Sequence, residues 1–159
     1  MRVQEGEGWR LVVDPARDPF SVLIGGEGWA AELTGGEARA LGRGVARLVR
    51  QHRELAPALM AEEALALELE MDLGADAGPA GPEAGGVLWL GLEGDRDRWS
   101  LRFVLSPGPT GRALEGSWTT TASLPLAAAL VAELAAEDTA EGAADLVGEA
   151  GGEAFGARP

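Results

Sequence analysis

The chain has 159 residues and a formal net charge of −13, and it contains 13 Arg, no Lys, no Cys, no Tyr and a single His, His52. Without Cys and Lys there is no thiolate nucleophile, disulfide, Schiff-base amine or Walker-type lysine. The acidic excess disfavours generic binding to nucleic acid and to anionic membranes. We therefore expect a protein that is not an enzyme and that uses no cofactor or metal.

We expect a cytoplasmic location for this protein. The first ten residues, MRVQEGEGWR, contain no apolar segment of the kind found in secretory signals. The sequence contains no run of 18 apolar residues, the length needed to cross a bilayer as a helix. The lack of Cys fits a reducing compartment.

The motif GEGW occurs twice near the start of the chain, at residues 6–9 and 26–29. Apolar runs bounded by Gly, Pro or Asp predict strands over 9–15, 20–24 and 29–33. Glycine supplies the backbone angles of a turn, and Trp then enters a strand where it can be buried. We therefore interpret the motif as a turn that begins a strand. The alternative, a paired ligand loop, lacks the helix that follows a phosphate-binding loop.

A long amphipathic helix is expected next. Thr34 and Glu37 have the spacing of a capping box that begins the helix, and Pro57 should bend or end it. Apolar positions and the single histidine share one face at helical spacing, at Leu41, Val45, Leu48, His52, Leu55 and Leu59. The opposite face carries a stripe of five arginines, Arg39, Arg43, Arg47, Arg50 and Arg53.

The segment 64–73, ALALELEMDL, combines helix-forming residue types with strict alternation of apolar and polar side chains. Because alternation decides which side chains reach a core together, we expect a strand. The Gly- and Pro-rich stretch 74–86 is expected to be a flexible loop. Three further strands are predicted over 87–93, 99–105 and 112–118.

A second helix is predicted over 124–137, with Ser123 as its N-cap and Pro125 in its first turn. The acidic, Ala- and Gly-rich residues 138–159 are expected to be a disordered tail. The predicted fold is α+β with antiparallel sheet, in the order βββ-α-ββββ-α, and forms a single domain over 1–137.

Six segments, taken together, resemble a small cyanobacterial family known only as domain-of-unknown-function family 1818. They are GEGWR (6–10), GGEGWAAELT (25–34), LMAEE (59–63), LWLGLEG (88–94), WSLRFVL (99–105) and ALEGSW (113–118). The resemblance covers about residues 5–135 and implies a fold like that of the Whirly and positive-cofactor-four single-stranded DNA-binding domains, with a repeated sheet-helix unit. The predicted order has one strand fewer in its first half. The resemblance implies no activity, and the acidic tail and the 74–86 loop weaken any transfer of DNA binding.

The arginine stripe is the only concentrated positive charge in the sequence. Arg grips phosphate in a bidentate way, so the stripe could form an anion or nucleic-acid site. The simpler interpretation is the solvated face of an amphipathic helix. An intermediate one is that the stripe docks an acidic partner or the chain's own acidic tail.

Trp89 differs from the other tryptophans of the second half. Trp99 and Trp118 share the parity of the apolar residues in their strands and are expected in the core. Trp89 alternates away from its apolar neighbours and lies beside Gly91, so it suits a stacking or protein-contact site. The alternative is that the long helix covers that face of the sheet as well.

Two further groups receive structural interpretations. We expect His52 to be a buried, hydrogen-bonded core residue, because no partner for catalysis is evident. The acidic residues Glu62, Glu63, Glu68, Glu70 and Asp72 suggest a metal site, but carboxylates about 7 Å apart along a strand are too distant for one ion. We expect an exposed face, paired across the strands with Arg102 or Arg112.

These observations predict a non-enzymatic binding or scaffold domain that contacts a protein partner. Its expected contact residues are Trp89, Arg102 and the five arginines of the stripe. The alternative is a single-stranded nucleic-acid-binding regulator with the Whirly-like fold. Self-association stays open, because the fold relatives form dimers.

Overall fold

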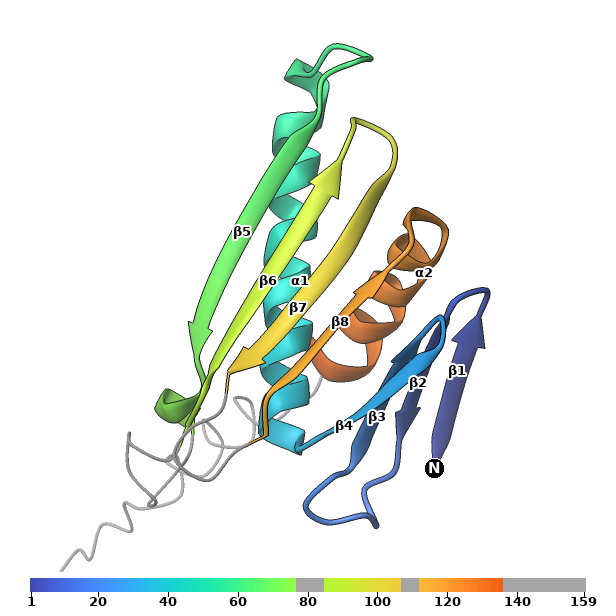
Figure 1. Cartoon of the computed structure of the whole chain (residues 1–159), viewed down its shortest axis with the longest axis vertical. Helices are drawn as coiled ribbons and strands as arrows, with labels where there is room; N and C mark the ends of the chain where they lie inside the picture. The colour runs from blue at the N-terminus through green and yellow to red at the C-terminus, as the bar shows by residue number, and fades with distance from the viewer. Residues whose placement is uncertain (77–84, 107–111, 136–159) are drawn as a thin grey trace, which may run out of the picture.

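The computed structural model describes residues 1–76, 85–106 and 112–135. The described chain forms two four-stranded antiparallel sheets and two main helices, which is an α+β architecture (Figure 1). The first sheet has the order β1-β2-β3-β4 and consists of β1 (Arg2–Gly6), β2 (Trp9–Val13), β3 (Val22–Gly26) and β4 (Trp29–Leu33). Helix α1 (Gly35–Leu55) and the short 3₁₀ turn η1 (Ala56–Ala58) follow it.

The second sheet has the order β5-β6-β7-β8, so each strand pairs with its neighbour in sequence. Its members are β5 (Leu65–Asp72), β6 (Val87–Gly94), β7 (Trp99–Ser106) and β8 (Leu114–Trp118), with a 3₁₀ turn η2 (Leu73–Asp76) after β5. Helix α2 (Thr120–Leu130) and a π-helical turn η4 (Val131–Ala135) complete the described chain. The described order is therefore ββββ-α-ββββ-α.

The prediction of three strands before α1 was one strand short. The missed strand, β1, pairs with β2 in full register from Arg2 opposite Val13 to Gly6 opposite Trp9. Four of its five residues are exposed, including its only large apolar residue, Val3. A polar edge strand has no alternating apolar pattern to reveal it, and the contacts that stabilise β1 come from β2 and, far away in the sequence, from α2 and Glu133.

The two GEGW motifs are turns, as predicted. Gly8 and Gly28 have φ of 76° and 78°, which is the left-handed region that favours glycine. At the first glycine of each motif, a side chain would collide with the indole of the following Trp, which lies across it. Each motif therefore needs both glycines, one for the turn and one for the tryptophan. Trp9 and Trp29 are partly buried and pack against the core.

Helix α1 begins and ends where its sequence predicts. The Thr34 hydroxyl accepts a hydrogen bond from the Glu37 N–H at 3.2 Å, and the Glu37 carboxylate accepts one from the Thr34 N–H at 3.4 Å. Pro57 lies in η1, directly after the α-helix ends at Leu55. The capping box is confirmed on both of its hydrogen bonds.

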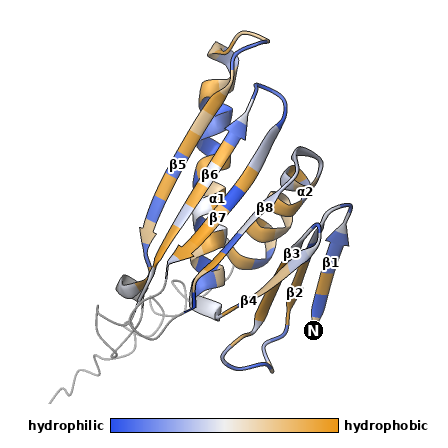
Figure 2. Cartoon of the chain, viewed as in Figure 1, coloured by the Kyte–Doolittle hydropathy of each residue, from blue (hydrophilic) through white to orange (hydrophobic). Residues whose placement is uncertain are grey.

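The segment 65–72 is a strand, so the alternation outweighed the helical propensity of its residues. Strand β5 pairs with β6 from Leu65 opposite Gly94 to Asp72 opposite Val87. Along β5 the Leu and Met side chains are buried or half-buried, and Ala66 and the acidic residues are exposed. Hydrophilic bands interrupt the apolar colour along β5 to β7 (Figure 2), which is the pattern of a sheet with one covered face.

The second helix begins four residues before its predicted start. Its N-cap is Thr119, whose hydroxyl accepts a hydrogen bond from the Ala122 N–H at 3.2 Å, and Pro125 lies inside the helix. Ser123, the predicted cap, is fully buried: its hydroxyl accepts a bond from the Leu101 N–H at 3.0 Å and donates to the Thr119 carbonyl at 2.7 Å. The Ser123 hydroxyl therefore bonds to β7 and does not cap the helix. This contact joins residues far apart in the chain, so the local sequence does not predict it.

Neither helix simply covers the sheet that it follows in the chain. Helix α1, which follows the first sheet, packs mainly on β5 and β6 of the second. Helix α2, which follows the second sheet, packs on β1 and β2 of the first as well as on β7. The buried side chains of both sheets and both helices form one continuous core. In Figure 1, α1 lies behind the second sheet, and the opposite face of that sheet is turned to the viewer with neither of the described helices, α1 or α2, over it.

Several predictions concern residues outside the described part. They are the central portion of the 74–86 loop, the last two residues of the predicted second helix and the 138–159 tail. Among the described helices, none is both long and apolar enough to span a bilayer.

Candidate functional site

The uncovered face of the second sheet is the first candidate surface. Its side chains alternate with those buried beneath α1, so none of the described residues on it is fully buried. We call this surface the open face; its residues with functional side chains are Glu68, Glu70 and Asp72 of β5, Trp89 and Glu93 of β6, Arg102 of β7 and Glu115 of β8. It contains five carboxylates and one guanidinium, so it is strongly acidic.

Trp89 lies flat on the open face. A side chain at Gly91 would come within 2.7 Å of the distal edge of the Trp89 ring, so the indole extends along its own strand over that glycine. The Arg102 guanidinium carbon lies 5.0 Å from the Trp89 ring centroid, in cation–π contact. The prediction that Trp89 lies on the other face from Leu88 and Leu90 is confirmed, and the alternative that α1 covers it is wrong.

The carboxylates of β5 are not paired across the strands with either predicted arginine. Strand β5 is an edge strand bonded to β6, so Glu68 lies opposite Gly91 and Glu70 opposite Trp89. Arg102 is on β7, one strand further from β5, and lies opposite Gly91 of β6. The expected Arg102 pairing was therefore wrong, because strand order and not composition decides cross-strand neighbours.

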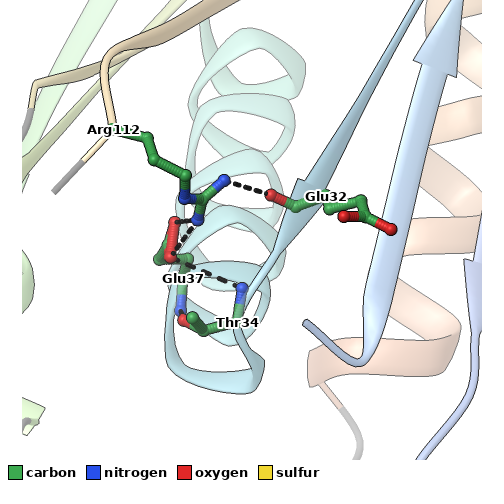
Figure 3. Close-up of polar contacts among 4 residues, drawn as sticks. All are labelled: Glu32, Thr34, Glu37 and Arg112. Atoms are coloured by element: carbon green, nitrogen blue, oxygen red, sulfur yellow. Dashed lines mark hydrogen bonds and ion pairs between the residues drawn. The ribbon is translucent and has the colours of Figure 1, made fainter. Parts of the chain in front are cut away.

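Arg112 lies just before β8, the strand at the opposite edge of the second sheet from β5, and connects the two sheets. Its guanidinium donates to the Glu32 carbonyl at 2.7 Å and to the Glu37 carboxylate at 3.0 and 3.3 Å (Figure 3). It also lies over the Phe20 ring, 4.3 Å from the centroid. The same carboxylate that caps α1 thus holds the segment before β8, a structural role that sequence reasoning missed.

His52 is buried and structural, as predicted. Its side chain is 5% exposed, its Nε2 lies 3.0 Å from the Asp95 carbonyl oxygen, and its ring is 6.0 Å from that of Trp99. Asp95 in turn accepts hydrogen bonds from the backbone N–H groups of Asp97 and Arg98, each at 2.8 Å. These bonds, that from Arg98 first, lower the pKa of the Asp95 carboxyl below its ordinary value.

The arginine stripe forms a second and separate surface. Arg47, Arg50 and Arg53 are exposed on α1, whereas Arg39 and Arg43 are half-buried. Because α1 covers the core face of the second sheet, the stripe lies on the opposite side of that sheet from Trp89 and Arg102. The structure therefore does not bring all the predicted contact residues together.

A groove lies beside the stripe, between α1 and the C-terminal helical segment. It has a volume of about 290 Å³. Its lining is apolar except for two arginines, and consists of Ala46, Val49, Arg50 and Arg53 of α1, with Leu124, Ala127, Ala128, Val131 and Ala132 of α2 and η4. Leu124 on its rim is 59% exposed. Within the described ranges, no group of three or more His, Asp or Glu side chains is arranged to hold a metal ion.

Comparison with known proteins places the chain in a family. The sequence matches the family described as Domain of unknown function (DUF1818) over residues 4–77 and 82–133. The chain belongs to the DUF1818 family. No curated protein matches it.

A solved structure is similar to this chain over most of its length. It is a crystal structure of a protein with unknown function from Prochlorococcus sp. NATL2A, described there as a member of the DUF155 family. The two chains are 33% identical with a TM-score of 0.67, and the match covers 86% of this chain and 98% of the other. The similarity extends the fold to a second protein and brings no activity with it.

Proposed function

We propose that this DUF1818 protein is a non-enzymatic binding domain whose open face contacts a basic surface of a protein partner. The observation that carries the proposal is Trp89, a large aromatic side chain held flat on an uncovered sheet face beside a row of carboxylates. An indole offers an apolar ring and a cation-binding face. The Nε1 of Trp89 donates to no described residue.

Charge decides between a protein and a nucleic-acid partner. The open face carries five carboxylates against Arg102, which attracts Arg and Lys side chains and repels phosphates. Glu68 and Glu70 lie beside Gly91 and Trp89 in the register, so a guanidinium reaching the indole would meet carboxylates at the same place. The alternative, single-stranded nucleic-acid binding, is supported by the Trp–Arg pair and by the Whirly-like fold that the resemblance implies.

The test follows the indole N–H signal of Trp89 in the full-length ¹⁵N-labelled chain during titration with an arginine octapeptide and, separately, with oligothymidylate. We expect the peptide to shift Trp89 and the amides of β6 and β7, and the oligonucleotide to leave them unchanged. The variant E68Q/E70Q should weaken peptide binding several-fold. The control E7Q/E27Q removes the same charge at the two exposed GEGW turns and should weaken it far less.

Two results would contradict the proposal. Equal weakening in E68Q/E70Q and E7Q/E27Q would mean that the peptide senses only the overall charge of the protein. A shift of Trp89 with oligothymidylate but not with the peptide would replace the proposal with the nucleic-acid alternative.

A further inference from the structure

We infer that the groove between α1 and the α2–η4 segment is a docking site for the chain's own acidic C-terminal segment, residues 136–159. This site lies across the molecule from the open face, so it does not depend on the proposed function. Three features support the inference: the lining of the groove, the arginines at its rim that form no ion pair with a described residue, and the sequence that follows its wall.

The rim of the groove carries positive charge that has no ion-pair partner among the described residues. Arg50 and Arg53 are exposed, and within the three described ranges no carboxylate is in ion-pair contact with either of them. Arg47, one turn earlier on α1, is likewise exposed. In a protein with a net charge of −13, this concentration of cations favours an acidic ligand.

The apolar lining of the groove favours a ligand that has apolar side chains as well as negative charge. Ala127 is buried, Val49 and Val131 are half-buried, and Leu124 projects at the rim. The volume of about 290 Å³ is at the lower limit of ordinary small-molecule sites, which occupy about 300–1,000 Å³. An open groove of this size suits a few aliphatic side chains of a peptide better than a cofactor. The matching ligand is therefore an acidic segment that also contains aliphatic residues.

Residues 136–159 have this composition. The segment contains one arginine, Arg158, and six acids, Glu137, Asp138, Glu141, Asp145, Glu149 and Glu153, so its net charge is 1 − 6 = −5. Leu146 and Val147 lie in the middle of the acidic run and can supply the aliphatic side chains.

Connectivity brings this segment to the groove. Val131 and Ala132 of η4 form part of the groove wall, and residue 136 follows directly after the end of η4 at Ala135. The ten residues from 136 to 145 can extend about 33 Å, whereas the groove side of α1 from Ala46 to Arg53 rises only about 10 Å. Attachment to the wall gives an effective concentration on the order of mM, so even a weak contact suffices.

The experiment uses paramagnetic broadening in the full chain. Because the protein has no Cys, the substitution A150C introduces a single site for a nitroxide label. At low salt we expect the label to remove most of the amide signal of Val49, Ala128 and Val131. The variant R50E/R53E should restore most of that signal, as should salt of about 1 M, where the Debye length falls to about 3 Å.

The control variant is R10E/R17E, which makes the same charge change at two exposed arginines of the first sheet region. It should leave the broadening unchanged. The inference is overturned if broadening stays confined to residues next to Ala135, or if R50E/R53E and R10E/R17E behave alike. It is also overturned if the broadening arises only between molecules, in a mixture of labelled unenriched chain and ¹⁵N chain without label, because the occupant would then belong to a second copy.

Discussion

Trp29 in the first sheet and Trp89 in the second have similar local settings and different surroundings. Each indole lies across a glycine of its own sheet, Gly26 for Trp29 and Gly91 for Trp89. In both cases the glycine provides the space that the flat ring needs. The local sequence therefore places both rings against a sheet but does not decide what covers them.

The tertiary structure decides what covers each indole ring. Trp29 packs between the sheets, with ring centroids 5.1 Å from Trp118 and 5.8 Å from Phe103, and its Nε1 donates to the Ser117 carbonyl at 3.2 Å. Trp89 has the Arg102 guanidinium over its ring and no aromatic neighbour within the described part of the chain. Both indoles are half-buried. The first arrangement joins two sheets, whereas the second leaves part of the indole accessible on the open face.

The largest expected loss of stability tests the aromatic cluster of Trp29, Phe103 and Trp118, which joins the two sheets. Trp118 is 3% exposed, and its Nε1 donates to the Gly25 carbonyl at 2.8 Å. The variant W118A should lose about 3–5 kcal/mol of unfolding free energy, since it leaves a cavity and removes a buried hydrogen bond. Guanidinium denaturation followed by far-ultraviolet circular dichroism measures the loss.

Trp89 provides the matched comparison for that measurement. The variant W89A removes the same side chain from the open face, where its packing is one-sided and the cation–π contact contributes about 0.5–1 kcal/mol. A loss of about 1 kcal/mol or less is therefore expected. If W89A is as destabilising as W118A, then Trp89 is a structural residue and the contact surface loses its main support.

A smaller effect tests the second connection between the sheets. The variant R112M keeps the apolar contact with Phe20 but removes the bonds to Glu37 and to the Glu32 carbonyl. Because the Arg112 side chain is 37% exposed and that of Glu37 is 17% exposed, we expect a loss of about 1–2 kcal/mol. The control R17M removes an ion pair between two side chains that are about half exposed, and should change stability by about 0.5 kcal/mol or less. Equal losses would mean that Arg112 does not connect the two halves.

The smallest effect concerns acid pH at the turn that holds His52. The native pKa of Asp95 is below its ordinary value of 3.8, mainly because the Arg98 N–H bonds the charged form. Its contribution to stability is therefore fully present above the unfolded pKa and is lost as the pH falls through the lower native pKa. Carbon-13 titration of the carboxyl should show a midpoint below 3.8, and D95N should flatten the acid limb of stability. A midpoint at or above the ordinary value would contradict the prediction.

Local and periodic features of the fold were predictable from the sequence. Period-two alternation identified β5 although its residues favour helix, and Thr34 with Glu37 marked the start of α1. These signals act between residues that are close in the chain. Strand β1 was missed because a polar edge strand has no such signal, and Ser123 was misassigned because its hydroxyl serves a strand 22 residues earlier.

For the candidate site, the sequence predicted on which face of the sheet each side chain lies. It did not predict which strands and helices lie beside those side chains. Parity placed Trp89 away from the apolar side of β6. The position of α1 could not be read in the same way: it depends on a close approach of Gly44 to Leu90, where a Cβ would collide with the leucine. The separation of Trp89 and Arg102 from the arginine stripe follows from that packing. The absence of an Arg102 pairing with β5 follows from the strand order, because β6 lies between β5 and β7.

The packing of α2 on the first sheet has a consequence for synthesis of the protein. The first sheet is complete at Leu33, but α2, which packs on its first two strands, begins only at Thr120, 120 − 33 = 87 residues later. At about 5–20 residues per second, a ribosome needs roughly 4–17 s to make that stretch. Throughout this interval the nascent chain exposes side chains such as Leu11 and Ile24 that are fully buried in the finished protein. Folding of this protein is thus completed after translation of its last helix, and the emerging N-terminal half is the part that chaperones would have to shield.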